Sequence, residues 1–180
     1  MKILVVGNKR NGKDALAELL NKHFGMTFKS SSEMANELFI YDELKSEYNY
    51  NSIKECFEDR HNHREEWYEM ICDYNKDDRS RLSKDILNKY ECYVGMRDLD
   101  EFNTSKDLFD VIIWVDASKR ITEGDSTNKI SIDESHIVLT NNGSFEDFES
   151  KSKVIGNIIF NLIPNGDLPV DFFKLNNLTW

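Results

Sequence analysis

A short segment near the amino terminus carries the clearest chemical signal in the sequence. Two glycines separated by four residues, with a lysine directly after the second, match the phosphate-loop spacing G-x-x-x-x-G-K. Glycines let the backbone turn several N–H groups toward one anion, and the lysine reaches the β- and γ-phosphates of a nucleotide. An ordinary glycine-containing turn is the alternative, but the apolar run before the loop and the amphipathic run after it favour a phosphate site. The predicted phosphate-binding residues are Gly7, Asn8, Lys9, Arg10, Asn11, Gly12 and the catalytic Lys13.

The next residue, Asp14, departs from the phosphate-loop pattern, which has serine or threonine there. That hydroxyl normally binds Mg²⁺, and a carboxylate could hold the ion directly or through water. Asp14 could equally serve only as a favourable partner for the positive end of a helix dipole. Both interpretations stay open, and Asp14 is the predicted metal ligand if the first is correct.

A second group of basic residues lies within the segment 60–64. Arginine matches phosphate oxygens with two parallel hydrogen bonds, so we predict that Arg60, His63 and Arg64 clamp an acceptor phosphate. A solvated helix start is the alternative. His61 and His63 do not form a predicted metal site, because no third or fourth ligand lies nearby in the sequence.

Three aromatic residues follow at helical spacing. Trp67, with Tyr68 and Tyr74, could stack on the base of an acceptor. Aromatic residues in this pattern also commonly form a core, and the sequence alone does not separate the two roles.

Two charged residues end predicted strands. Arg97 could contact the acceptor or the transferring phosphate, and an ion pair with Asp98 or Glu101 is the alternative. Asp116 could orient Mg²⁺ or cap the following segment.

Strand and helix patterns alternate along the chain, which predicts βαβ crossovers and a mostly parallel sheet. In such a sheet, ligands bind beyond the carboxyl ends of the strands, where the motifs above fall. Residues 42–62 lack a clear period, and we expect them to be irregular with one helical turn near 52–58. The helix over 33–39 is predicted to be capped by Ser32. Predicted strands cover 2–6, 26–30, 91–96, 110–116 and 136–141, and the other predicted helices cover 13–24, 63–75, 79–90, 99–108 and 144–163.

Composition excludes several classes of protein. A chain of 180 residues predicts one domain, and a net charge of −10 argues against a nucleic-acid partner. No apolar run approaches the length of a membrane span or of a signal peptide, so we expect a cytoplasmic protein that does not bind membranes. The three cysteines share no C-x-x-C spacing and are expected to be reduced. The apolar segment 169–180 is expected to dock on the protein or on a second subunit, which would form a homodimer.

The loop "GNKRNGKD" resembles the phosphate loops of phage-type deoxynucleoside monophosphate kinases and of phosphomevalonate kinase, which also tend to carry aspartate after the lysine. Three further stretches are similar to these or related nucleoside monophosphate and dephospho-coenzyme A kinases, in the same order along the chain. They are "YVGMRDLDEF" (93–102), "VDASKR" (115–120) and "HIVLTNNGSFEDF" (136–148).

The resemblance implies a three-layer α/β phosphate-loop kinase fold with a helical acceptor-side insertion. It implies one kinase domain over 1–180, with 40–90 as the acceptor subdomain and 119–135 as a short lid. ATP and Mg²⁺ would be the cofactors, and Arg97 and Arg120 would be catalytic cations at the transferred phosphate. The resemblance places the adenine near Asn141, Asn142 and Gly143.

The predicted function is phosphoryl transfer from ATP to a small nucleotide, a (deoxy)nucleoside monophosphate. One alternative is a kinase that acts on a hydroxymethylated pyrimidine in DNA. Another is a nucleotide-binding regulatory protein without turnover. Gly95 stands where the similar kinases often have an acidic residue, and the predicted lid holds a single arginine, Arg120; both features favour this last alternative.

Overall fold

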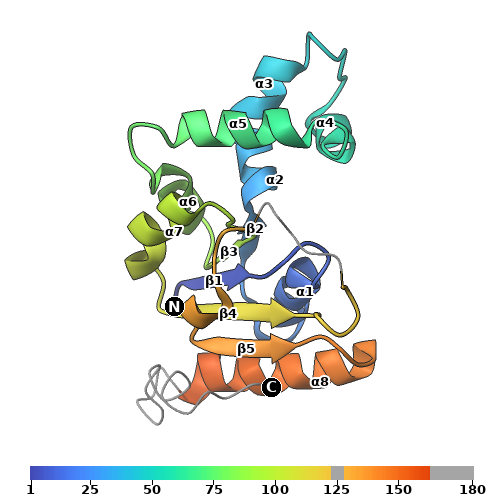
Figure 1. The fold of residues 1–180 in the computed structure, drawn as a ribbon, viewed down its shortest axis with the longest axis vertical. Helices are drawn as coiled ribbons and strands as arrows, with labels where there is room; N and C mark the ends of the chain where they lie inside the picture. The colour runs from blue at the N-terminus through green and yellow to red at the C-terminus, as the bar shows by residue number, and fades with distance from the viewer. Residues whose placement is uncertain (123–127, 163–180) are drawn as a thin grey trace.

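A five-stranded parallel sheet forms the centre of the protein. The computed structural model describes residues 1–122 and 128–162, so residues 123–127 of the predicted lid and the predicted docking segment 169–180 lie outside the described residues. The strand order is β2-β3-β1-β4-β5, and every neighbouring pair is parallel (Figure 1). The strands are β1 (Ile3–Val6), β2 (Phe28–Ser30), β3 (Cys92–Val94), β4 (Val111–Asp116) and β5 (Ile137–Thr140).

Two helical layers cover the sheet, which confirms the predicted α/β class. Helices α1 and α8 pack on one face, where alternate strand residues such as Val5 and Ile113 meet Leu20 and Phe148. The opposite face, with Leu4 and the other alternate residues, packs against α2, α6 and α7. The helices of these layers are α1 (Lys13–Phe24), α2 (Ser31–Ala35), α6 (Arg81–Leu87), α7 (Leu99–Ser105) and α8 (Phe145–Asn157).

A third group of helices stands beyond the carboxyl ends of β2 and β3 and has a core of its own. Helices α3 (Tyr41–Leu44), α4 (Ile53–Asp59) and α5 (Arg64–Tyr74) form the upper part of Figure 1. Their core contains Ile40, Leu44, Cys56 and Trp67. Helix α6 also falls within the predicted 40–90 subdomain, but it packs on the sheet.

One local prediction was wrong, and a second was incomplete. The N-cap of α2 is Ser30 rather than Ser32, because Ser30 and Glu33 form a reciprocal capping box: Ser30 Oγ accepts from Glu33 N at 3.2 Å, and Glu33 Oε2 accepts from Ser30 N at 3.1 Å. Helix α4 matches the helical turn predicted near 52–58. The start of the segment 42–62 was expected to be irregular, but it contains the end of a continuous helical run, since the π-helical stretch Asn36–Ile40 joins α2 to α3. These helices are short, and short helices carry little periodicity.

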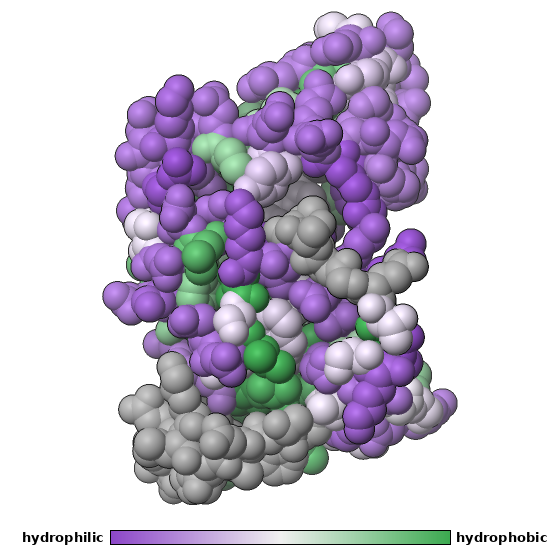
Figure 2. Space-filling model, in the orientation of Figure 1, coloured by the Kyte–Doolittle hydropathy of each residue, from purple (hydrophilic) through white to green (hydrophobic). Residues whose placement is uncertain are grey.

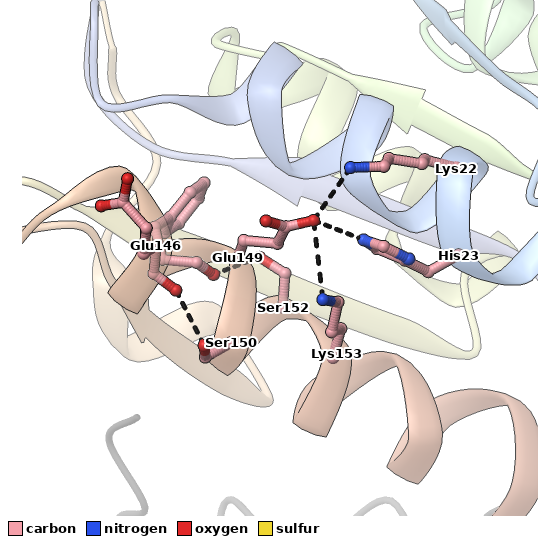
Figure 3. A network of polar contacts seen from close by, with 8 residues as sticks. Lys22, His23, Glu146, Glu149, Ser150, Ser152 and Lys153 are labelled. Atoms are coloured by element: carbon pink, nitrogen blue, oxygen red, sulfur yellow. Dashed lines mark hydrogen bonds and ion pairs between the residues drawn. The ribbon is translucent and has the colours of Figure 1, made fainter.

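A polar network ties the two helices on one face of the sheet. Glu149 of α8 accepts from Lys22 Nζ at 3.0 Å and contacts His23 Nε2 of α1 at 2.8 Å, with Lys153 3.6 Å away (Figure 3). Hydrogen bonds from Lys22 and His23 lower the pKa of Glu149 to about 2. This network lies on the outside of the α1–α8 pair.

The face of the molecule seen in Figure 2 is mostly polar. Apolar residues reach the surface there mainly in its middle and lower parts. Within the described residues, no helix has both the length and the apolar character needed to span a membrane.

Candidate functional site

The loop between β1 and α1 has a backbone that only glycine accommodates at two positions. Gly7 has φ of 141° and Gly12 has φ of 99°, both in the region that favours glycine. A Cβ at Gly7 would lie 2.5 Å from the carbonyl oxygen of Val115, and a Cβ at Gly12 would lie 2.4 Å from Asn141 Nδ2. Gly7 is therefore required by its φ and by the backbone of β4, whereas Gly12 is favoured mainly by its φ, because the side chain of Asn141 could move.

Lys13 folds back over this loop. Its Nζ donates to the carbonyl oxygens of Gly7 and Asn8, each at 2.8 Å, and the residue is only 8% exposed. Asn11 fixes the loop to β4, because its Nδ2 donates to the carbonyl of Val115 at 2.9 Å. A cation held beside a rigid turn at the start of a helix can bind phosphate oxygens.

The loop borders a cleft of about 550 Å³. Its walls come from the β1–α1 loop, the start of α2, helices α4 and α5, and the segment between β3 and α7. Five of the seven arginines in the sequence line the cleft together with two lysines. These cations are Lys9, Arg10, Lys13, Arg60, Arg64, Arg79 and Arg97. A cleft with this lining is suited to a ligand that carries several phosphate groups, although the protein as a whole is acidic.

The cleft brings together most of the residues predicted for the acceptor. Arg60, Arg64, Trp67 and Arg97 all line it. The guanidinium of Arg60 lies 3.9 Å from the centre of the Phe57 ring, and its Nη1 donates to the Phe57 carbonyl at 2.8 Å. Arg60 is thereby oriented from its own helix.

Trp67 is mainly a core residue. It is only 4% exposed and packs in the core of the α3–α5 group, with its ring 6.4 Å from that of Phe57. Tyr68, which follows it, is exposed and donates to Asp98 Oδ2 at 3.3 Å. Tyr74 stacks on Phe39 outside the cleft lining. Of the three aromatic residues, Tyr68 offers the most open surface to a base.

His63 lies apart from the other predicted acceptor residues. It is not among the residues that line the cleft, and its ring contacts Asp59 Oδ2 at 3.0 Å and the ring of Tyr48 at 4.1 Å between centres. Its carbonyl accepts from Trp67 N at 3.0 Å at the start of α5. These contacts assign His63 to the α4–α5 junction. The spacing with Arg64 that suggested a clamp reflects two residues on different sides of a helix start.

The turn after β5, Asn141 to Gly143, lies against the phosphate loop but does not line the cleft. Asn141 Nδ2 donates to the Asn11 carbonyl at 2.9 Å, and the Asn141 carbonyl accepts from Arg120 Nε at 2.8 Å. Arg120 is exposed and is not among the cleft-lining residues. Asn142 and Gly143 continue the same turn. The turn therefore packs against the glycine loop, and Arg120 contacts the turn rather than the cleft.

Asp116 is held as a cap. One of its oxygens accepts from Ser118 N and the other from Ser118 Oγ and Asn142 Nδ2, all at 3.1 Å. Of the two interpretations open for Asp116, this geometry favours capping. Asp14, in contrast, is exposed on the first turn of α1 and lines the cleft beside Lys13. Asp14 therefore fits a Mg²⁺ ion that also binds nucleotide phosphates, an arrangement that needs only one or two protein carboxylates.

The backbone conformation at residue 95 accounts for the glycine there. It follows β3 with φ of 95°, a conformation that side chains rarely adopt, and its N–H donates to the Val5 carbonyl at 3.0 Å. An acidic residue there would be strained. The turn between β3 and Arg97 is thus built without a carboxylate at this position.

Among the cleft residues that the sequence did not single out as site residues are Arg79 and Glu101. Arg79 lies before α6 and joins the other cations. Glu101 of α7 is buried, and burial raises its pKa to about 7. The sequence had marked Glu101 as an alternative ion-pair partner for Arg97 and, together with Arg97, as the R-x-x-x-E part of the stretch 93–102 that resembles the phage-type kinases. A carboxylate on a helix directly after a strand end was the available signal for it.

Comparisons with known proteins give a limited result. No protein-family model matches the chain, and no curated protein matches it either. Among solved structures, the chain is similar to that of shikimate kinase from Aquifex aeolicus vf5, with 14% sequence identity and a TM-score of 0.40. The similarity covers 87% of this chain and 82% of that one. The resemblance to phage-type deoxynucleoside monophosphate kinases is not confirmed, and the function must be inferred from the residues of the cleft.

Proposed function

We propose that this protein is an ATP-dependent phosphotransferase whose acceptor is a (deoxy)nucleoside monophosphate. One observation carries the proposal: a glycine loop with an inward-folded lysine and four further arginines, from α4, α5, the α5–α6 connection and the β3–α7 segment, line a single cleft. Phosphoryl transfer needs positioning and charge neutralisation more than covalent chemistry. The cleft offers both.

The donor nucleotide would bind with its phosphates on residues 7–14 and its adenine beside the turn formed by Asn141, Asn142 and Gly143. The backbone of the loop and Lys13 would orient the β- and γ-phosphates. Mg²⁺, when bound, would neutralise charge on the same phosphates, with Asp14 as its protein ligand. Arg120 donates to the Asn141 carbonyl at 2.8 Å, so it would approach the transferred phosphate from the side where the adenine binds.

The acceptor phosphate would face the donor across the cleft. Arg60 and Arg64 extend from the helical group, whereas Arg97 follows β3, the strand that pairs with β1 next to the phosphate loop. We therefore assign to Arg97 the neutralisation of the transferred group, and to Arg60 and Arg64 the binding of the acceptor. Arg79 would add a third cation on the acceptor side.

Nucleotide binding without turnover is the second candidate. Two observations favour it: Gly95 replaces the acidic residue that similar kinases carry, and the carboxylate of Asp116 is occupied by Ser118 and Asn142. Both reduce the number of carboxylates near a metal. The two functions differ in one measurable property, the consumption of ATP.

The test is a panel of ribo- and deoxyribonucleoside monophosphates, each assayed with ATP and Mg²⁺ by following ADP release. A kinase releases ADP rapidly only with its acceptor, and the panel then identifies the base and sugar. ATP binding without ADP release above background, for every acceptor, would favour the regulatory function and overturn the proposal.

A further inference from the structure

A buried carboxyl group on the wall of the cleft takes no part in the chemistry proposed above. Glu101 is only 4% exposed, yet it lines the cleft. Its Oε1 accepts hydrogen bonds from the hydroxyl of Tyr93 at 2.9 Å and from the hydroxyl of Ser83 at 3.1 Å. These two donors, on β3 and α6, fix the orientation of the carboxyl group. Burying such a group costs free energy, and buried carboxyls in clefts are concentrated at functional sites.

Only one of its two side-chain oxygens is engaged. No hydrogen bond reaches Glu101 Oε2 from residues 1–122 or 128–162. This oxygen is also not sealed in the interior: in the described parts of the chain, the sealed side-chain atoms without a partner are Asn36 Oδ1, Trp67 Nε1 and Ser105 Oγ. Since Glu101 lines the cleft, Oε2 is the atom through which it can contact a ligand there.

We propose that Glu101 Oε2 accepts a hydrogen bond from an N–H or O–H group on the base or sugar of the acceptor, and so selects acceptors that carry this donor. The inference rests on the proposed function. Phosphate is excluded from this position because two anions repel strongly where water is scarce. The cleft therefore has a polarity: arginines hold the phosphate of the acceptor, and Glu101 reads its uncharged part.

The charges around Glu101 make this recognition dependent on pH. Burial is the largest cause of its raised pKa of about 7, and Asp98 at the start of α7 adds to the rise, whereas Tyr93 and Ser83 lower it. Cys72 of α5 interacts electrostatically with Glu101, Asp98 and Arg79, so these groups lie close together, and Arg97 lines the same cleft. Because the ionised carboxylate is the stronger acceptor, the acceptor should bind more tightly as pH rises from 6 to 8.

The variant Glu101→Gln tests the proposal with little change in shape. The hydroxyls of Tyr93 and Ser83 can still donate to the amide oxygen, which leaves the amide NH₂ at the position of Oε2. A donor then faces a donor. At pH 8 we expect the KM for the acceptor to rise about tenfold or more, because a hydrogen bond to a charged group is lost. The KM for ATP and the kcat at saturating acceptor should stay within about threefold.

Two comparisons isolate the effect. Glu18→Gln removes another carboxylate, an exposed one on α1 beside the same cleft, and should change the KM for the acceptor less than about threefold. Ribo-, deoxy- and base-modified monophosphates separate the two sources of the donor. For an acceptor that lacks the donor group recognised by Glu101, wild type and Glu101→Gln should have the same KM. The phosphate of the acceptor titrates near pH 6 in both proteins, so only the difference between their pH profiles reports Glu101.

The outcomes separate this inference from the proposed function. If wild type transfers phosphate to a monophosphate and a folded Glu101→Gln variant has the same acceptor KM from pH 6 to 8, Glu101 is structural and only this inference fails. If Glu101→Gln does not fold, Tyr93→Phe, which removes one of the two donors that orient the carboxyl, must still raise the acceptor KM selectively. If wild type binds and uses no monophosphate at all, the proposed function fails and this inference fails with it.

Discussion

Replacing Glu101 by glutamine should stabilise the free protein at pH 8, because the wild-type carboxylate is ionised in a place that disfavours charge. The pKa of Glu101 is raised from 4.5 to about 7, mainly by burial. The folded protein therefore keeps a proton that the unfolded chain releases, and stability falls as pH rises through the interval from 4.5 to about 7. The gap between the two pKa values corresponds to roughly 3 kcal/mol at pH 8.

The glutamine variant avoids this cost but still buries a polar amide. We therefore expect a gain of about 1–2 kcal/mol at pH 8 and a difference that disappears near pH 5. For a chain of this length, 1 kcal/mol shifts Tm by roughly 2–4 °C, so thermal unfolding at several pH values resolves the effect.

A control with the opposite sign is available on the far side of the sheet. The pKa of Glu149 is lowered to about 2 by Lys22 and His23, so its contribution to stability is present above pH 4.5 and is lost as pH falls toward 2. Glu149→Gln should lower Tm slightly at pH 8, where Glu101→Gln raises it. If Glu101→Gln is less stable than wild type by the same amount at pH 5 and pH 8, the carboxyl is not a strained buried acid and the reasoning is refuted.

Three further predictions concern the phosphate loop and the arginines. Gly12→Ala should weaken ATP binding about tenfold or more and reduce stability by about 1–3 kcal/mol, because Gly12 has positive φ and the added Cβ would lie 2.4 Å from Asn141 Nδ2. Gly25→Ala is the matched control and should leave ATP binding intact. Gly25 also has positive φ, but no atom lies within 4 Å of the added Cβ. Arg64→Ala should raise the KM for the acceptor with kcat nearly unchanged, whereas Arg97→Ala should lower kcat with both substrates saturating, and the reverse pattern in steady-state kinetics would show that the two sides are wrongly assigned. Asp14→Ser should keep activity and Asp14→Ala should require more Mg²⁺, so an unchanged Mg²⁺ titration for the alanine variant would leave Asp14 with only a helix-dipole role.

The sequence predicted the sheet and the position of the glycine loop well because both leave a local signal. The run 110–116 is rich in β-branched and aromatic residues, which favours a buried strand, and Gly7 and Gly12 mark a tight turn between that kind of strand and a helix. The confirmed strand positions then place the motif at the carboxyl edge of the sheet without further information.

The acceptor side was harder to predict because its residues meet only through tertiary contacts. Arg79 reaches the cleft from the connection before α6, and Glu101 reaches it from α7. Their local sequence does not show that the fold brings these two segments to the same cleft. His63 shows the converse, since its neighbours suggested a clamp while its ring contacts Asp59 and Tyr48. The functional meaning of a charged residue outside a motif depends on the neighbours that the fold provides.

Transfer of the γ-phosphoryl group, followed with labelled ATP in wild type and in Lys13→Ala, tests the central claim most directly. Wild type should produce a labelled nucleoside diphosphate from at least one monophosphate. Lys13→Ala should fold with a similar Tm and transfer label about 10²- to 10³-fold more slowly, because the lysine neutralises charge on the β- and γ-phosphates. Equal rates of transfer in the two proteins, or no labelled diphosphate from any monophosphate with wild type, would contradict the account.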